Sequence, residues 1–284
     1  MPPPSPQPET IDIWILAGQS NMVGENAVDG TDGSLLGPDC FQPAPGRLRM
    51  FPISTYTWTD ARPCVGCISN GCAGSGDACR LVLGPDMAFG NALLAANVSS
   101  RVGFVPTALG GTSLNVDWAP NTPGGLYGRM INATRAAMAA AGPNARLRGM
   151  LWVQGESDAL HPAGGYYIAA AYAQNMRNFM ARARQDLAPF HPKLPVIMAM
   201  QAVTNRDTIF PWIWILRFQQ EELMADASQQ PLLAVDMEGL SFFYQVIGGS
   251  PPQWVHLSHL GVCQLGRAMA ARYITSGLAA APPS

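Results

Sequence analysis

The stretch Ile11-Asp-Ile-Trp-Ile-Leu-Ala-Gly-Gln-Ser20 decides the fold of this 284-residue chain. Its first residues are almost all apolar, and the glycine that follows them ends the run. A short apolar run with such an end is typical of a strand that is buried on both faces of a parallel sheet. Four more runs share this pattern, and they cover residues 102–109, 148–153, 195–200 and 232–236. The sequence therefore predicts a sheet of about five buried strands.

Helical patterns separate the predicted strands. Apolar residues at helical spacing predict helices over residues 86–96, 125–141, 166–187, 212–227 and 259–273. Strands that alternate with helices form βαβ units, in which helices cover both faces of a parallel sheet. We predict an α/β fold, a three-layer α/β/α sandwich, in one domain over residues 11–275. Residues 1–10 and 276–284 are expected to be flexible tails.

The composition argues against several classes of protein. Hydrophobic residues make up 48% of the chain and charged residues only 13%, below the roughly 25% of an average domain. The formal net charge is −2, and Lys and Arg do not cluster as contact with a phosphate backbone requires. No apolar run approaches the roughly 18 residues of a membrane span. We expect neither nucleic acid nor a membrane as a partner, and we expect a monomer.

One segment, residues 24–84, interrupts the alternation, because it is rich in Gly, Pro and Cys and shows little periodicity. It follows the first strand, which places it at the carboxyl edge of the sheet, where open α/β folds carry their sites. We interpret residues from about 38 to 84 as a Cys-rich insertion that forms a lid or pocket wall. A surface insertion without a chemical role is the alternative.

The cysteines indicate in which cellular compartment the protein folds. The six cysteines are Cys40, Cys64, Cys67, Cys72, Cys79 and Cys263. The four in residues 64–79 are expected to form disulfides, with a zinc site of thiolate ligands as the alternative. Cys263 lies in a predicted helix and is expected to pack as a small apolar side chain. Disulfides and the glycosylation sequons at Asn97 and Asn132 favour a secreted protein, although residues 1–10 lack the layout of a signal peptide.

Ser20 follows the first strand at a turn into a helix. A serine at such a turn has an exposed hydroxyl, and its backbone N–H is one of the unpaired donors of the helix start. A nucleophile with an adjacent donor for negative charge needs this arrangement. The alternative is a serine that only caps the helix.

Two polar segments follow the next two strands. Gly110-Gly111-Thr112-Ser113 follows the second strand, and paired glycines let backbone N–H groups approach a ligand closely, unless they only form a tight turn. Gln154-Gly155-Glu156-Ser157-Asp158 follows the third strand. The amide of Gln154 could donate to an oxyanion and Glu156 could orient a histidine. The alternative is that Ser157 and Asp158 cap a helix beside a solvated Glu156.

His256 precedes the last predicted helix, in the segment Gln253-Trp-Val-His256-Leu-Ser-His259. From there an imidazole can reach over the sheet edge, and a histidine that merely caps or packs is the alternative. His259 is expected at the start of that helix, and His161 and His191 lie beside prolines in predicted loops. Ser20, the paired glycines, an amide and His256 together supply a nucleophile, an oxyanion hole and a base, the groups that acyl transfer requires.

With these segments assembled, the sequence resembles the SGNH hydrolase superfamily and, within it, the sialate O-acetylesterase-like domains of carbohydrate esterase family six. The matching blocks are Gly18-Gln19-Ser20-Asn21-Met22, Gly110-Gly111-Thr112-Ser113 with Trp118, Gln154-Gly155-Glu156-Ser157, Val235-Asp-Met-Glu-Gly-Leu240 and Val255-His256-Leu257. The likeness spans residues 11 to about 275. It implies a flavodoxin-like sheet and a serine esterase that removes acetyl or other small acyl groups from carbohydrates, without a metal or cofactor.

The resemblance also implies a role for each matching residue. Ser20 is the nucleophile and His256 its base. The oxyanion hole consists of the Ser20 backbone N–H, a backbone N–H of Gly110 or Gly111, and the side chain of Gln154. The residues expected to contact the substrate are Gln19, Asn21, Thr112 and Trp118.

Gln253 departs from the family pattern, which usually has Asp three residues before the histidine. Glutamine lacks the negative charge that stabilises imidazolium, and loss of the acid costs on the order of 10⁴ in turnover in serine proteases. Some members are thought to use the Glu of the Gln-Gly-Glu block, which points to Glu156, with Asp236 as a weaker candidate. Val153, where His or Tyr is frequent, is a second departure. A sugar-binding protein on a degenerate esterase fold, which Gln253 favours, and an O-acetyltransferase are the alternatives.

Overall fold

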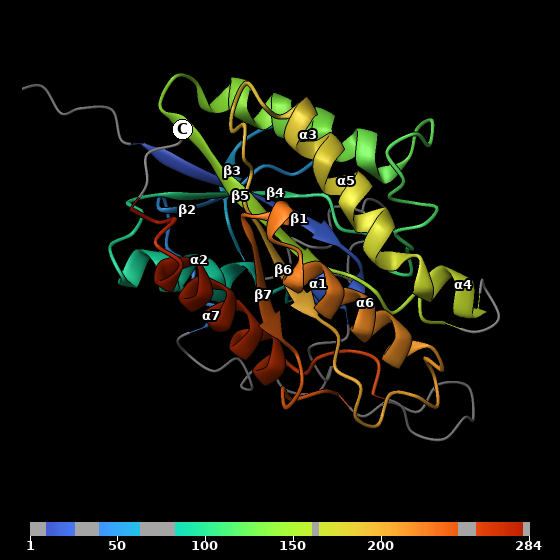
Figure 1. Cartoon of the computed structure of the whole chain (residues 1–284). Coiled ribbons are helices and arrows are strands. Elements are labelled where there is room, and N and C mark those ends of the chain that lie inside the picture. Colours follow the sequence, from blue (N-terminus) through green and yellow to red (C-terminus); the bar gives the residue numbers. More distant parts are fainter. Residues whose placement is uncertain (1–9, 26–39, 63–82, 161–164, 244–253, 281–284) are drawn as a thin grey trace, which may run out of the picture.

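The computed structural model describes residues 10–25, 40–62, 83–160, 165–243 and 254–280. A seven-stranded sheet forms its centre (Figure 1), with the strand order β3-β2-β4-β1-β5-β6-β7. Neighbouring strands run parallel, except for the antiparallel pair β2 and β3. The strands are β1 (Ile11–Gly18), β2 (Leu48–Met50), β3 (Thr59–Asp60), β4 (Val102–Pro106), β5 (Ala145–Val153), β6 (Val196–Met200) and β7 (Leu232–Asp236).

Helices cover both faces of this sheet (Figure 1). The apolar cluster on one face includes side chains of α3, α5 and α6, and the cluster on the other face includes side chains of α2 and α7. None of the described helices is long and apolar enough to cross a bilayer. The helices are α1 (Ser20–Val23), α2 (Asp86–Ala95), α3 (Leu126–Ala141), α4 (Gly165–Ala170), α5 (Tyr172–Asp186), α6 (Ile213–Ala225), a 3₁₀ turn (Ala227–Gln229) and α7 (His259–Thr275).

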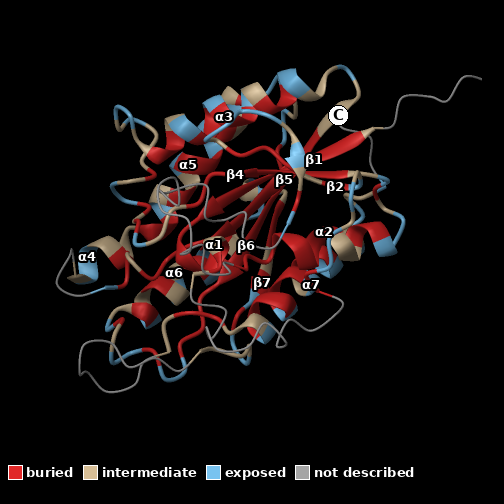
Figure 2. Ribbon diagram, turned by 180° about the vertical axis from the view of Figure 1, so that it is seen from behind, coloured by how far each residue is buried: buried red, intermediate tan, exposed pale blue. Residues whose placement is uncertain are grey.

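β1 shows why an unbroken apolar run suits the centre of the sheet. Successive side chains of a strand point to opposite faces, so Ile13 and Ile15 enter one apolar cluster while Trp14 and Leu16 enter the other. The Trp14 ring packs edge-on against Phe89 of α2 and against a tyrosine of α7, with centroids 4.8 and 4.7 Å away. Every residue of β1 is buried, as Figure 2 shows for the strands between the helical layers.

The structure confirms the α/β sandwich and the five predicted strands, and it adds two. The strand count from sequence falls short because β2 and β3 lie inside the Cys-rich insertion and contain three and two residues. Strands this short show no period-2 pattern. The predicted helices are also present, but the helix expected over 166–187 is interrupted at Ala171, which separates α4 from α5.

The connections place three loops at one edge of the sheet. Without β2 and β3 the order is β4-β1-β5-β6-β7, which is the flavodoxin-like order 2-1-3-4-5. In such sheets the crevice for ligands lies at the carboxyl ends of the strands, beside the first strand, where the connections change direction. The loops after β1, β4 and β5 therefore meet there, and they carry Ser20, Gly110 with Gly111, and Gln154.

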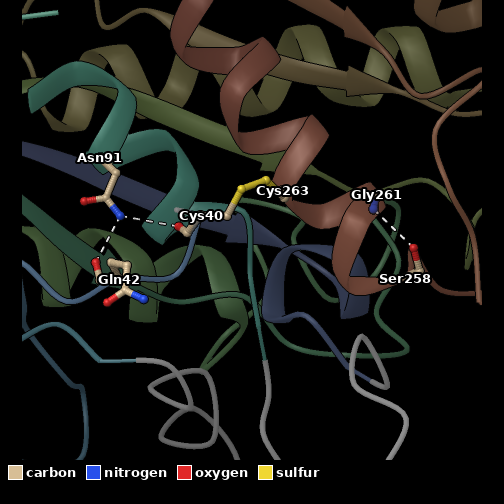
Figure 3. Close-up of a disulfide and its surroundings, with 6 residues drawn as sticks. All are labelled: Cys40, Gln42, Asn91, Ser258, Gly261 and Cys263. Atoms are coloured by element: carbon tan, nitrogen blue, oxygen red, sulfur yellow. Dashed lines mark hydrogen bonds between the residues drawn. A yellow bond between two sulfur atoms is a disulfide. The ribbon is translucent and has the colours of Figure 1, made fainter. Parts of the chain in front are cut away.

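A disulfide corrects the prediction for Cys263, which does not pack as an unpaired apolar side chain. Cys263 on α7 is bonded to Cys40, 223 positions earlier, with a Cα–Cα distance of 5.7 Å (Figure 3). Asn91 of α2 donates from Nδ2 to the carbonyl oxygen of Gln42 at 3.0 Å, which holds the same segment beside the helices. Local sequence patterns cannot reveal this pairing, because it depends on two distant segments that meet only in the fold.

Part of the predicted C-terminal tail is packed. Leu278 and Ala279 lie against the apolar cluster of α2 and α7, and Arg148 donates from Nη2 to the Ala279 carbonyl oxygen at 3.0 Å. The remaining tail predictions concern residues 1–9 and 281–284, which lie outside the described residues, and so do Cys64, Cys67, Cys72 and Cys79.

Candidate active site

Ser20 stands where β1 ends and α1 begins. Gly18 has a φ of +126°, and a Cβ at this position would overlap the backbone of Val153 on β5. The backbone N–H of Gln19 donates to the Val153 carbonyl oxygen at 2.8 Å, so the turn is fixed to the neighbouring strand. The chain then enters the short helix α1, and Ser20 is 5% exposed. Glycine is required at position 18, and the sheet itself sets the position of Ser20.

Backbone donors lie at the ends of β1 and β4. The N–H groups of Ser20, Gly110 and Gly111 donate to no group within the part of the chain that the structure describes. The loop of the two glycines is anchored to the Ser20 turn, because the N–H of Leu109 donates to the Gly18 carbonyl oxygen at 3.0 Å. The carboxylate of Glu25 lies so close to Gly110 that a Cβ there would overlap it. Unpaired N–H groups at adjacent strand ends are suited to an oxyanion hole.

The side chain of Gln154 lies among buried acceptors, and its role as an oxyanion donor stays a prediction. Its side-chain N–H₂ faces three acceptors: Oε1 of Gln19 at 3.2 Å, the Thr112 carbonyl oxygen at 3.0 Å and a carboxylate oxygen of Asp158. An amide nitrogen has two N–H donors, so both are in use. Exchange of the amide N and O would bring oxygen against these acceptors and is excluded by repulsion. The Oε1 of Gln154 is buried without a partner among the described residues, and it is an acceptor.

The four residues expected to contact the substrate are buried and have internal partners. Oε1 of Gln19 accepts from the backbone N–H of Gly155 at 3.4 Å and of Ser157 at 3.3 Å. The Thr112 hydroxyl donates to the Leu109 carbonyl oxygen at 2.7 Å and accepts from Nε1 of Trp118 at 3.1 Å. These bonds connect the loops after β1 and β5 and stabilise the loop after β4, and contact of these residues with a substrate stays a prediction.

Asn21, the fourth of them, connects the Ser20 turn to the histidine loop. Its Oδ1 accepts from the backbone N–H of Leu257 at 2.9 Å, and its Nδ2 donates to the Val255 carbonyl oxygen at 3.3 Å. Both residues flank His256. The same Nδ2 donates to Oε1 of Glu156 at 2.6 Å. A single side chain next to Ser20 thus holds the backbone on both sides of His256.

Glu156 is a buried charge with a buried partner, and it is not the solvated residue of the alternative interpretation. Its Oε1 lies 3.3 Å from Nη2 of Arg206, and its Oε2 accepts from Nε2 of Gln201 at 3.0 Å. The Glu156 and Arg206 side chains are 2% and 1% exposed. A buried carboxylate requires such compensation by charge and hydrogen bonds.

Arg206 is a candidate site residue that sequence reasoning missed. Its Nε donates to the Trp254 carbonyl oxygen at 2.9 Å and its Nη2 to the Val255 carbonyl oxygen at 3.1 Å, so it binds the backbone just before His256. Its guanidinium lies over the rings of Phe210 and Phe242, 5.0 and 4.8 Å from the centroids. The surrounding sequence Thr204-Asn-Arg-Asp207 is typical of an exposed loop, so no local signal marks the residue.

His256 is 9% exposed in the loop before α7. The N–H of Phe243 donates to the His256 carbonyl oxygen at 2.7 Å, and the N–H of Ser258 donates to the Ser241 carbonyl oxygen at 2.9 Å. Burial lowers the pKa of His256 below 6.5, while the charge of Glu156 raises it and that of Arg206 lowers it. At neutral pH the imidazole is therefore uncharged and able to accept a proton. His259 begins α7, as expected.

Comparison with known proteins places this chain in a family. A model of the family described as carbohydrate esterase, sialic acid-specific acetylesterase, matches residues 10–275. The chain belongs to this family of carbohydrate esterases. A probable carbohydrate esterase of Arabidopsis thaliana is 28% identical over an alignment of 273 residues, and the match covers 93% of this chain and 90% of the relative.

Solved structures agree with the family. The X-ray structure of the Arabidopsis thaliana protein has a TM-score of 0.71 at 27% identity, and the match covers 94% of this chain and 99% of that one. NanS has a TM-score of 0.64 at 17% identity, with 95% and 97% of the two chains covered. A carbohydrate acetylesterase from Xanthomonas citri has a TM-score of 0.60 at 19% identity, and the match covers 94% of this chain and 57% of that one. At these identities the last two matches show a common fold.

The weaker candidate for the acid and the two departures from the family pattern lie in different parts of this carbohydrate esterase. Asp236, the weaker candidate for the acid, is bonded to Arg217 with distances of 2.8 and 2.6 Å between the oxygens and the guanidinium nitrogens. Its side chain is 48% exposed, so this carboxylate is engaged at the surface. Val153 is fully buried in the sheet. Gln253 lies outside the described residues. Of the two candidate carboxylates, Glu156 is the one whose charge raises the pKa of His256.

Proposed function

We propose that this carbohydrate esterase hydrolyses O-acetyl and other small acyl esters on carbohydrates, with Ser20 as nucleophile and His256 as general base. The observation that carries the proposal is the pair of hydrogen bonds between the Asn21 side chain and the backbone on either side of His256. They hold the histidine loop to the turn of Ser20, and this supports the proposal because acyl transfer needs a nucleophile beside its base.

In the proposed mechanism the Ser20 hydroxyl attacks the acyl carbonyl carbon while His256 takes the hydroxyl proton. The backbone N–H groups of Ser20 and of Gly110 or Gly111 bind the oxyanion of the tetrahedral intermediate. His256 then protonates the departing sugar oxygen, and the acyl group remains on Ser20. A water molecule, deprotonated by His256, attacks the acyl-enzyme and releases acetate. No step requires a metal or an organic cofactor.

Glu156 serves this mechanism through its charge and its hydrogen bonds. Its negative charge favours the imidazolium form of His256, as the acid of a triad does. It also accepts from Asn21 and pairs with Arg206, the two side chains that hold the histidine loop. We assign Gln154 a supporting role in this mechanism, because its amide nitrogen contacts Oε1 of Gln19 and the Thr112 carbonyl oxygen and so joins the loops after β1, β4 and β5.

Release of p-nitrophenol from its acetate ester tests the nucleophile. We expect the parent protein to turn over and Ser20→Ala to lose at least on the order of 10⁴-fold in turnover. Ser157→Ala is the matched control, since it removes a serine hydroxyl from the loop after β5 and should leave turnover nearly unchanged. Activity that survives in Ser20→Ala would refute the assignment.

Binding of glycans without turnover in the folded parent would instead identify a sugar-binding protein on the same fold. Release of acetate in water without any acceptor sugar would argue against an O-acetyltransferase. These two readouts separate the esterase from both alternatives.

The role of the Glu156 carboxylate is tested by comparing the turnover of two variants. We expect Glu156→Gln to reduce turnover far more than Gln253→Ala, because only Glu156 supplies a negative charge near His256. Circular dichroism and thermal unfolding must show that both variants are folded before their rates are compared. The reverse ranking would mean that the residue three positions before His256 is the functional partner of the imidazole.

A further inference from the structure

A cavity of about 330 Å³ lies between the loop that follows β4 and one face of α5. Its loop wall includes Leu114, Asn115 and Asn121, and its helix wall includes Asn175 and Asn178. The volume lies at the lower end of the range for small-molecule sites, roughly 300–1,000 Å³. None of these residues takes part in the mechanism proposed above.

The lining has the chemistry of a site for hydroxyl groups. Four amides line it, and each amide side chain carries two N–H donors and a carbonyl acceptor. A sugar hydroxyl both donates and accepts, so an amide can satisfy either function. Leu114 and Pro120 add apolar surface that suits the C–H face of a sugar ring. Nδ2 of Asn175 donates to Oδ1 of Asn115 at 3.2 Å across the two walls, which leaves further donors and acceptors on both amides.

The charge of the lining favours a neutral ligand. Arg182 lines the cavity, but its Nε lies 2.9 Å from a carboxylate oxygen of Asp186, one helical turn away. The same carboxylate accepts from the hydroxyl of Tyr127 at 2.7 Å. An acidic sugar would require an arginine with an unpaired charge for bidentate binding of its carboxylate. Arg182 is already paired.

The cavity is close to the candidate oxyanion hole. Leu114 is three residues after Gly111, and three residues span at most about 11 Å. The wall is also fixed to the loop after β5, because Asp158 accepts from the backbone N–H of Leu114 at 2.9 Å and of Asn115 at 3.2 Å. The same carboxylate accepts from Gln154. A ligand in the cavity is therefore held at a defined position relative to Ser20.

We propose that this cavity is a subsite for a neutral sugar unit of the same glycan, next to the unit whose ester is cleaved. The part of this proposal that links the subsite to ester cleavage rests on the function proposed above. The binding of an unmodified neutral oligosaccharide follows from the lining alone. The two statements can therefore fail separately.

The first test is calorimetric titration of Ser20→Ala with unacetylated tetrasaccharides. The probes are the neutral tetramers of xylose, mannose and glucose, and tetragalacturonate as the acidic one. We expect at least one neutral tetramer to bind more tightly than tetragalacturonate. We expect Asn121→Ala combined with Asn178→Ala to weaken that binding about tenfold, through the loss of two hydrogen-bonding groups. Both residues are exposed, so the substitutions should not unfold the chain.

The second test measures kinetics on the chemically acetylated form of the tetramer that binds. The double variant should raise KM about tenfold with kcat unchanged, and its rate on p-nitrophenyl acetate should equal that of the parent. Gln185→Ala, an exposed amide on the same helix outside the cavity lining, is the control and should change neither value. Three results would overturn the subsite. They are no binding of any neutral tetramer, tighter binding of tetragalacturonate than of every neutral tetramer, and equal affinity of Ser20→Ala with and without the two asparagine substitutions. Absence of ester turnover with intact neutral binding would refute the proposed function alone.

Discussion

The two halves of the candidate active site are held by different means. On the Ser20 side, the sheet sets the geometry: β1 and β5 lie side by side, and the turn after β1 is bonded to Val153. On the His256 side, the loop lies outside the sheet, and two side chains hold it together with a few backbone hydrogen bonds. Asn21, Arg206 and the Ser241 backbone come from three separate parts of the chain and all bind residues 254–258.

This contrast shows where precision in the site depends on regular structure and where it depends on buried polar groups. A strand end is fixed by many backbone hydrogen bonds, so the loss of one side chain leaves it in place. The histidine loop is fixed by a few hydrogen bonds, those from Arg206 being charge-assisted, and loss of one of them both shifts the loop and leaves a buried polar group unpaired. The His256 side should therefore be the more sensitive to substitution.

The largest effect is expected for Arg206→Met. This change leaves Glu156 as an uncompensated buried charge and removes two bonds to the backbone before His256. We expect a loss of about 3–5 kcal/mol in the free energy of unfolding, measured in urea, together with reduced turnover. Arg177→Met is the matched control. Arg177 pairs with Glu222 and Asp226 near the surface, so its loss should cost about 1 kcal/mol or less.

A double variant shows whether the effect arises from the buried pair. Arg206→Met combined with Glu156→Gln removes both charges, so its loss of stability should be smaller than the sum of the two single losses. Additive losses would mean that the two side chains act independently and that the histidine loop does not depend on their pairing.

The same contrast explains what the sequence can and cannot reveal. Ser20, the glycines after β4 and Gln154 follow apolar strands, so a local pattern of a buried run and its end locates them. His256 is found because it precedes a helix with a recognisable start. Arg206 occurs in a polar segment like any exposed loop, and its burial arises only when residues 201, 242 and 254 surround it. The direction of the Gln154 amide depends in the same way on Gln19, Thr112 and Asp158.

The next effect concerns the Cys40–Cys263 disulfide, which ties the segment before β2 to the helix that follows His256. We expect Cys40→Ala and Cys263→Ala each to lower the free energy of unfolding by about 2–4 kcal/mol, because the cross-link limits the unfolded chain. The double variant should lose no more than either single variant, since one bond is removed in all three cases. Losses that add would show that packing of the two side chains, and not the bond, provides the stability.

The smallest expected effect is a shift of the pH profile of kcat/KM. The direction of the shift distinguishes the effect of the Glu156 charge on His256 from that of the Arg206 charge. Burial lowers the pKa of His256, so the acidic limb of kcat/KM should fall below pH 6.5. Glu156 raises this pKa, so Glu156→Gln should move the limb to lower pH. Arg206 lowers the pKa, so Arg206→Met should move the limb to higher pH, measured where the variant is folded. Each shift should be at most about one pH unit, which corresponds to about 1.4 kcal/mol. Asp236→Asn, which removes an exposed carboxylate paired with Arg217, should leave the limb in place. Suppose instead that Glu156→Gln and Arg206→Met moved the limb in the same direction. Glu156 and Arg206 would then act on His256 through the position of the histidine loop, and their charges would have no separate influence on the base.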